Sequence, residues 1–115
     1  MAVDPKSSGE ERARLLALVQ GYRATCIVVT ALELGLVDEL RAAPMNEELL
    51  ASRLGAHLPS LRRFLRALQA IGLIEPQAAG MGLTSMGWLL ADGNAGVRER
   101  AMLVGEEYLP AWQDL

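Results

Sequence analysis

The spacing of apolar and polar residues predicts a chain built mainly of helices. Between Glu10 and Leu34 only Gly21 interrupts a helical pattern, and a glycine inside a helix costs about 1 kcal/mol relative to alanine. The pattern therefore predicts either a kink at Gly21 or two helices joined there. The apolar positions beyond Gly21 fall on two stripes, Ala24, Ile27, Val28 and Ala31 on one and Tyr22, Cys26, Val29 and Leu32 on the other. A helix that is apolar on two sides needs cover on both, which favours pairing with a second copy of the chain over a central helix wrapped by its own neighbours.

Further helical segments follow, with recognisable ends. Gly35 is suited to end the preceding helix, and the next residues, 36–41, form a short amphipathic turn. Asn46 is a good N-cap for a helix that ends at Gly55. Another helix begins near Leu58–Pro59 and ends at Gly72. Its broad apolar face consists of Leu61, Phe64, Leu65, Leu68 and Ile71.

The segment after this helix predicts a small β-hairpin. Residues 73–75 and 81–83 favour strands, and residues 76–80 between them are rich in turn formers. A winged helix has the order helix, tight turn, second helix and hairpin, which is the order predicted here. The predicted fold class is therefore mainly α, with a helical dimerisation region plus a winged helix-turn-helix that carries a small β-hairpin.

The last part of the chain predicts more helix. Thr84 is placed to cap a short helix that reaches Leu90, and residues 92–96 form a loop of turn-forming residues. A helical pattern then runs from Val97 up to Pro110, where we expect it to stop.

Composition limits the classes of protein to which the chain can belong. Its 115 residues suffice for one domain, and 51% hydrophobic with 22% charged residues is typical of a globular protein. The first residues do not resemble a signal peptide, and the most apolar run, Ala24–Leu32, is shorter than the roughly 20 residues of a membrane-spanning helix. A single cysteine, Cys26, gives no sign of an oxidising compartment. We therefore expect a cytoplasmic protein without a membrane partner.

Charge leaves one alternative function open. Arg62, Arg63 and Arg66 share the polar face of the second helix of the predicted winged helix, where a transcription regulator would read DNA. The net charge of −3 and the absence of any Lys or Arg between Arg66 and Arg98 argue against it, because DNA affinity needs several phosphate contacts. We expect no nucleic-acid partner, and keep a stand-alone winged-helix DNA-binding regulator as the alternative.

Catalytic chemistry has little support in the sequence. His57, the one histidine, lies in the predicted turn of the helix pair, and without a His–Cys cluster no zinc site is expected. Gly80 and Gly82 fail the GxGxxG spacing because Ser85 stands at the third position. Cys26 lies in the most apolar stretch and is best interpreted as a packed small residue. We predict no catalytic, cofactor-binding or metal-binding residue in this chain.

Four segments together resemble a known family. They are TALELGLVDEL at 30–40, ELLASRLGAHLPSLRRFLRALQAIGLIE at 48–75, GLTSMGWLLAD at 82–92 and YLPAWQDL at 108–115. In this order they are similar to the N-terminal dimerisation and winged-helix region of S-adenosylmethionine-dependent small-molecule O-methyltransferases. That family includes plant caffeic acid O-methyltransferases and the tailoring methyltransferases of bacterial polyketide and anthracycline pathways.

The resemblance implies a division of the chain and a set of partners. Residues 1–9 would be a disordered N-terminus, 10–42 the dimerisation helices, 43–92 the winged helix, and 93–115 C-terminal helices leading toward a missing S-adenosylmethionine-binding domain. The implied function is the dimerisation and substrate-lid module of such an enzyme, acting on a small aromatic natural-product acceptor. Its partners would be a second copy of the chain and a catalytic domain, in cis or in trans, that binds S-adenosylmethionine. A non-catalytic protein that binds a full-length relative is also open.

The same resemblance implies which residues touch a substrate. The substrate-lid candidates are Met102, Leu103, Leu109 and Trp112, and the candidates that reach a partner chain's pocket are Cys26 and Ile27. Ordinary core packing is the alternative for all six, because a Met or Trp at helical spacing is common in cores.

Overall fold

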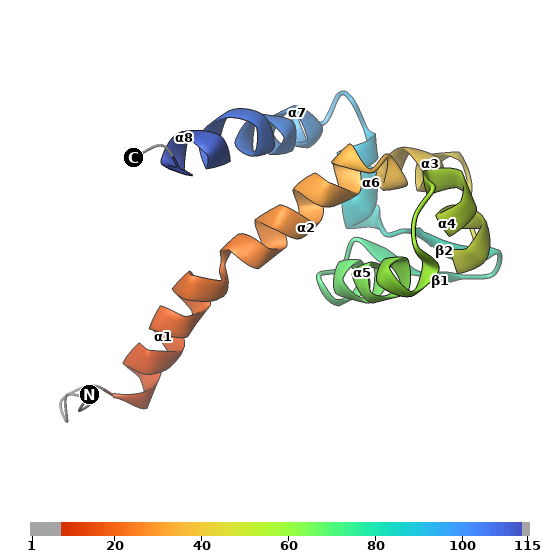
Figure 1. The fold of residues 1–115 in the computed structure, drawn as a ribbon. Helices are drawn as coiled ribbons and strands as arrows, with labels where there is room; N and C mark the ends of the chain where they lie inside the picture. Colours follow the sequence, from red (N-terminus) through yellow and green to blue (C-terminus); the bar gives the residue numbers. More distant parts are fainter. Residues whose placement is uncertain (1–7, 114–115) are drawn as a thin grey trace.

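Two helices form a long rod at the N-terminal side of the molecule. The computed structural model describes residues 8–113. Its first helix, α1 (Gly9–Gln20), is followed by α2 (Tyr22–Glu33) in nearly the same direction (Figure 1). Gly21 lies between them with helical dihedral angles, φ −58° and ψ −28°, and its N–H donates to the Leu18 carbonyl oxygen at 3.3 Å. The predicted joint at Gly21 is confirmed, and it bends the rod without reversing the chain.

The rod begins earlier than the sequence predicted. The Ser8 side chain accepts a hydrogen bond from the Glu11 N–H at 3.0 Å, which is the geometry of an N-cap, and Gly9 is already helical. The expectation that residues 1–9 are disordered was therefore wrong for Ser8 and Gly9, because the capping serine satisfies a free backbone donor of the first turn. The rest of that segment, 1–7, lies outside the described residues.

Three helices follow the rod and begin the winged helix. They are α3 (Leu36–Ala42), α4 (Glu47–Leu54) and α5 (Leu58–Ala70). Asn46 caps α4 as predicted, since its side chain accepts from the Leu49 N–H at 2.8 Å. The predicted stop at Gly35 is confirmed by its positive φ of 81°, a conformation that glycine adopts without a steric cost.

A β-hairpin completes the winged helix. Strands β1 (Ile74–Gln77) and β2 (Gly80–Leu83) pair antiparallel, with Pro76 opposite Met81, and Met45 forms an isolated bridge to the other side of Met81. The loop predicted at 76–80 was too long, because Pro76 belongs to β1. Proline is tolerated there since β1 is an edge strand, so the missing N–H breaks no pairing with a further strand.

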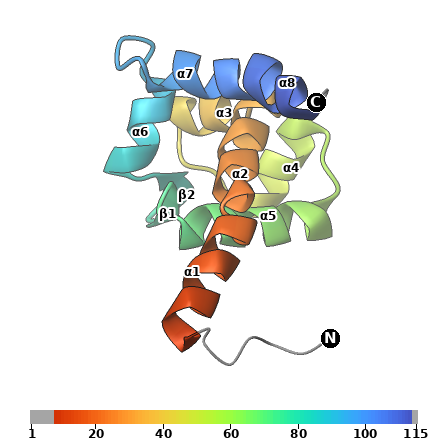
Figure 2. The same cartoon turned by 90° about the vertical axis from the view of Figure 1, so that its left-hand side faces the viewer.

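The core lies where α2, α3, α4, α5, the hairpin and the following helix α6 (Ser85–Ala91) meet (Figure 2). Its largest fully buried side chains are Leu36, Leu40, Leu50, Leu65, Leu68 and Ile74. Thr84 caps α6 by accepting from the Gly87 N–H at 3.0 Å. The predicted fold class, mainly α with a winged helix-turn-helix and a small hairpin, is confirmed.

A second helical arm crosses the rod at the C-terminal side. It contains α7 (Val97–Leu103), a π-helical segment η1 (Val104–Tyr108) and α8 (Leu109–Gln113), and Figure 2 shows it lying across α2. The expectation that the helix stops at Pro110 was wrong. Pro110 is the second residue of α8, where proline is tolerated because the N–H groups of a first turn need no partner in the preceding turn.

Candidate functional site

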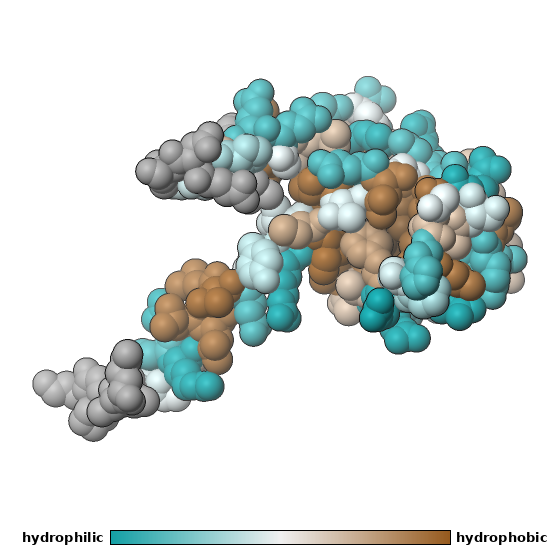
Figure 3. Space-filling view, viewed as in Figure 1, coloured by the Kyte–Doolittle hydropathy of each residue, from teal (hydrophilic) through white to brown (hydrophobic). Residues whose placement is uncertain are grey.

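Among the described residues, a row of strongly exposed apolar side chains runs along α1 to the first residue of α2. We call it the arm stripe: Leu15, Leu18, Val19 and Tyr22. Their exposed fractions are 62, 78, 61 and 60%, and no residue of α1 is buried. The spacing of three, four and seven residues places them on one side of the helix. In Figure 3 this apolar surface projects from the body of the molecule.

Length and composition would also allow this rod to cross a membrane. The helix from Gly9 to Glu33 has 25 residues, with a mean hydropathy of 1.6 in its most apolar stretch, of which 17% is buried. The apolar run considered in the sequence, 24–32, was too short a measure of this helix because the helix continues through Gly21. The core helix of a soluble protein and a signal sequence pass the same test, so this property alone does not favour a membrane.

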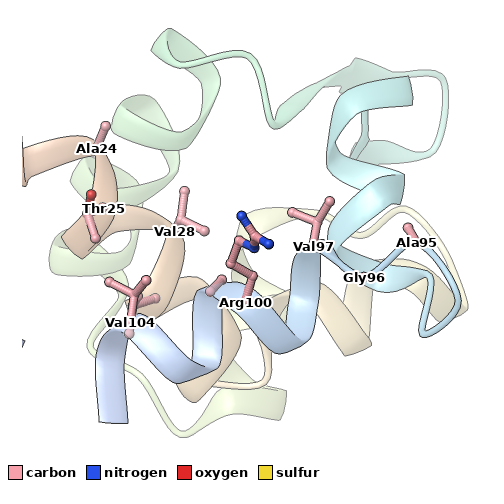
Figure 4. Close-up of a pocket in the computed structure, with 10 residues that line it drawn as sticks. Ala24, Thr25, Val28, Ala95, Gly96, Val97, Arg100 and Val104 are labelled. Atoms are coloured by element: carbon pink, nitrogen blue, oxygen red, sulfur yellow. The ribbon is translucent and has the colours of Figure 1, made fainter. Parts of the chain in front are cut away.

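An open apolar groove of about 690 Å³ lies between α2 and the C-terminal arm. Figure 4 shows its two walls, one from α2 and the other from the loop before α7, α7 itself and the start of η1. The lining residues are Ala24, Thr25, Val28, Val29, Ala95, Gly96, Val97, Arg100, Ala101 and Val104. Most are small or apolar, so the groove can receive another apolar surface at close range.

Two contacts hold the C-terminal arm against the rest of the fold. Arg98 on α7 forms a two-pronged ion pair with Asp38 on α3, with N–O distances of 2.9 and 3.0 Å. The hydrogen bond from Arg98 lowers the pKa of Asp38 and correspondingly raises the pKa of the guanidinium. Further along the arm, Gly105 lies against Val29, where an added Cβ would stand 2.6 Å from Val29 Cγ1. The absence of a side chain at Gly105 therefore lets η1 pack directly on α2.

The residues predicted to touch a partner or a substrate lie in different environments. Cys26 is exposed, whereas Ile27 is half-buried against the core. Met102 is also half-buried against the core, while Leu103 and Trp112 have exposed fractions of 36 and 70%. The side chain of Leu109, the remaining candidate, lies outside the described residues.

These candidates do not form one cluster with the groove. None of the candidates with a described side chain lines the groove between α2 and α7, although Leu103 borders a smaller hollow beside it. Their roles at a lid or a partner's pocket stay predictions.

The predicted DNA-reading face is partly neutralised by acidic side chains. Arg62 donates to Glu47 at 2.7 Å and to Glu48 at 3.2 Å, and the pKa of its guanidinium is raised, mainly by the hydrogen bond to Glu47. Both carboxylates belong to the first turn of α4, where the helix dipole also favours them. Arg63 reaches only the Ser60 hydroxyl, at 3.5 Å. The described part of the chain therefore gives the DNA-binding alternative no support.

Catalytic and metal-binding groups do not converge in the described residues. His57 is exposed at the N-terminus of α5, where its Nδ1 lies 2.9 Å from the Ser60 hydroxyl. No group of three His, Cys, Asp or Glu residues that could hold a metal occurs within residues 8–113.

The described residues also do not fit S-adenosylmethionine, the cofactor that the resemblance implies. Their one sheet is an antiparallel hairpin, whereas a dinucleotide-type site needs a glycine-rich turn between a parallel strand and a helix. Gly80 and Gly82 offer no cradle for a ligand. A Cβ on Gly80 would collide with the Met45 backbone, and one on Gly82 with the Gln77 side chain.

The groove itself was missed by reasoning from the sequence. Its walls are separated by about 70 residues, and no local pattern marks Thr25, Val97 or Arg100 as neighbours. The one signal that could have been read is the run of small residues Ala95 and Gly96 directly before α7.

Comparisons with known proteins give this site a context. Residues 16–93 match the O-methyltransferase dimerisation domain. The chain is 36% identical over 103 residues to the phenazine O-methyltransferase PhzM of Lysobacter antibioticus, covering 88% of this chain and 30% of that protein. The chain thus spans about a third of the length of the curated relative.

Solved structures share the fold. The crystal structure of LaPhzM superposes with a TM-score of 0.75 at 35% identity, covering 90% of this chain and 32% of the other. NcsB1, an O-methyltransferase from neocarzinostatin biosynthesis solved with S-adenosylhomocysteine, gives a TM-score of 0.60 at 34% identity, covering 70% and 27%. The matched segment includes three of the four arm-stripe residues, α2 and the whole winged helix, and on that match the chain belongs to the family of O-methyltransferase dimerisation domains.

Proposed function

We propose that this chain is the dimer-forming module of an O-methyltransferase and pairs with a second copy of itself through its N-terminal rod. The observation that carries the proposal is the arm stripe, four large apolar side chains that are 60–78% exposed, three of them on α1, which has no buried residue, and the fourth at the start of α2. Isolated apolar side chains on a surface are normal, but a continuous stripe on a projecting helix is typical of an interaction site.

The energetics of burial support pairing. Burying a large apolar side chain is worth about 1.5–3 kcal/mol, so two arm stripes together would release on the order of 10 kcal/mol. Association costs about 4–15 kcal/mol in lost translational and rotational freedom and in side-chain ordering. Burial of the arm stripes alone therefore roughly offsets the free-energy cost of association, and any further buried surface makes the dimer stable.

Methyl transfer itself would come from a second unit. The chain spans about a third of its relatives and its described residues do not fit the methyl donor, so the donor and the catalytic groups would belong to a catalytic domain in cis or in trans. S-adenosylmethionine is the proposed donor, since NcsB1 was solved with the product S-adenosylhomocysteine. A small aromatic natural product is the proposed acceptor, because phenazine is named for the relative. Such an enzyme would work in the cytoplasm.

The C-terminal arm is the proposed substrate lid. Leu103 and Trp112 expose apolar surface along α7 and α8, and Met102 lies between the exposed side and the core. An apolar lid would exclude water from an aromatic acceptor, which is the role that we propose for Met102, Leu103, Leu109 and Trp112. Cys26 and Ile27 are proposed to face the partner chain.

Sedimentation equilibrium of the chain at micromolar concentration tests the proposal. We expect a dimer for the wild type and a monomer with unchanged helicity for Leu18→Arg, because a charged side chain would be placed in the paired stripe. The matched control is Leu49→Arg, since Leu49 is 48% exposed on α4, away from the arm. A wild-type monomer that keeps full helicity, or a Leu18→Arg protein that stays dimeric, would overturn the proposal.

A further inference from the structure

We propose that the π-helical segment η1 sets the side of the C-terminal arm on which Trp112 lies, and that Gly105 is the positioning residue that allows this segment to form. The inference rests on the proposed function, because Trp112 belongs to the proposed substrate lid. A π-helical turn is rare, and it usually occurs as a single turn within an α-helix, often at a functional site. Here it lies between α7 and α8, the two helices that carry the lid candidates.

The arm is one continuous helix that changes its winding in the middle. α7, η1 and α8 follow one another without a break. A π turn closes its hydrogen bonds over five residues instead of four, so it takes up about one residue more than an α turn. Every residue beyond η1 is therefore rotated by about 100° relative to an uninterrupted α-helix. The direction in which α8 presents its side chains thus depends on η1.

This rotation aligns Trp112 with the apolar wall of the arm. Val97 and Val104 both line the groove and are seven residues apart, about two α turns, so they lie on one side of the arm. Trp112 follows Val104 by eight residues, and in an uninterrupted α-helix the two side chains would stand about 80° apart. With one residue taken up by η1 the effective spacing is seven, and Trp112 faces the same side as Val104.

The rotation changes what the tryptophan ring can do. Without the π turn, Trp112 would follow Ala101 by eleven residues, about three α turns, and would stand in line with a residue that packs against the core. With the π turn, the ring extends the apolar wall beyond Val104. Its exposed fraction of 70% leaves the ring free to cover an aromatic acceptor, as the proposed lid requires.

Gly105 allows η1 to lie against α2, where the arm crosses the rod (Figure 2). A Cβ at Gly105 would stand 2.6 Å from Val29 Cγ1, which is closer than van der Waals contact allows. Val29 does not move aside easily, because it is buried and its β-branched side chain is stiff about χ1. A larger residue at 105 would therefore push η1 away from α2 and change the orientation of α8.

Two other side chains of η1 do not hold the turn in place. Glu106 and Glu107 are exposed, and neither forms a salt bridge within residues 8–113. The close approach of Gly105 to Val29 is therefore the contact to test.

Fluorescence quenching reports the side of the arm on which Trp112 lies. In a Cys26→Ser background of the full chain, a bimane label is attached to Val104→Cys, where a nearby tryptophan ring quenches it. We expect about threefold lower fluorescence than in the same protein with Trp112→Phe, because the label and the ring share one side of the helix. The Trp112→Phe reference also accounts for quenching by Trp88. Circular dichroism checks that helicity is kept.

A change of chain length distinguishes a π turn from an α turn. Removal of Glu106 leaves a true spacing of seven residues in an α-helix, so we expect the quenching to stay at the level of the labelled parent. Insertion of one alanine after Glu106 turns Trp112 away from Val104, and the quenching should fall to the Trp112→Phe level. If removal of Glu106 instead strengthens the quenching, as it would in an uninterrupted α-helix, the π-helical alignment is wrong.

The role of Gly105 is tested by a substitution and its rescue. Gly105→Ala should abolish the quenching while helicity is kept, and Val29→Ala in the same chain should restore it, because the colliding Cγ atoms are removed. Glu107→Ala is the matched control within the same turn and should quench like the parent. Full quenching in Gly105→Ala, or no recovery with Val29→Ala, would show that Gly105 is not the positioning residue.

These outcomes are separate from those that test the proposed function. Labelled protein is diluted into an excess of unlabelled Trp112→Phe protein, so that the quenching ring belongs to the labelled chain. A monomeric wild type with the expected quenching refutes the proposed dimer and leaves the positioning of Trp112 intact. A dimeric wild type without quenching refutes the positioning and leaves the dimer intact.

Discussion

Gly87 is the residue at which the smallest change should have a large effect on the fold. It is buried in α6, and a Cβ added there would overlap the carbonyl oxygen of Leu73 and stand 3.3 Å from Leu83 Cδ2. The same carbonyl oxygen accepts the Thr84 N–H at 3.1 Å. Backbone atoms cannot move aside as a flexible side chain can, so Gly87→Ala must shift α6 away from the strand that follows α5.

The cost of that shift can be worked out from its parts. Overpacking costs about 1–3 kcal/mol, and a weakened hydrogen bond to a buried carbonyl a further 1–3 kcal/mol or so. Alanine's better helix propensity returns about 1 kcal/mol. We therefore expect Gly87→Ala to lower the free energy of unfolding by about 3 kcal/mol.

Urea denaturation followed by circular dichroism measures this loss. With a slope of about 1–3 kcal/mol per molar urea, the midpoint should fall by roughly 1–3 M. Gly93→Ala is the control, because nothing lies within 4 Å of a Cβ at Gly93, and its midpoint should stay close to that of the wild type. Equal midpoints for the two variants would refute the steric reasoning.

Three further predictions concern a helix cap, an ion pair and the DNA-binding alternative. Asn46→Ala should lower the free energy of unfolding by about 1 kcal/mol in a thermal melt, because the N-cap of α4 is lost. Arg98 lowers the pKa of Asp38, so the ion pair stabilises the fold above the ordinary carboxyl range and loses this effect as the pH falls through the lowered pKa. The difference between wild type and Asp38→Asn, up to about 1 kcal/mol at neutral pH, should therefore vanish in acid when measured by urea denaturation. Duplex DNA should bind weakly and without sequence preference, and its affinity should fall further as the salt concentration rises from about 50 to 200 mM. A sequence-selective complex that is lost in Arg66→Ala would contradict this.

The parts of the fold that local chemistry determines could be predicted from the sequence. Asn46 and Thr84 cap helices because their short side chains accept backbone N–H groups, and Gly35 ends α2 because it adopts a positive φ. These effects need only neighbours in sequence. The winged-helix order and the joint at Gly21 follow from the same local rules.

The parts that depend on distant packing could not be predicted in this way. Arg98 and Asp38 are 60 residues apart, and nothing near either residue indicates the other. Val29 was predicted to need a partner chain, yet Gly105 and the core of its own chain bury it. Pro76 was placed in a loop because its pairing with Met81 depends on which strand lies at the edge. The groove depends on all such contacts together, so it emerges only in three dimensions.

The separation of the groove's walls along the chain also sets the order in which the surfaces arise during synthesis. Translation proceeds from the N-terminus, so the ribosome releases the arm stripe while the wall from 95–104 has not yet been made. Through that interval the stripe is exposed and the groove does not yet exist. A nascent copy therefore presents this apolar surface before its own winged helix can fold, which makes the stripe an aggregation-prone segment during synthesis.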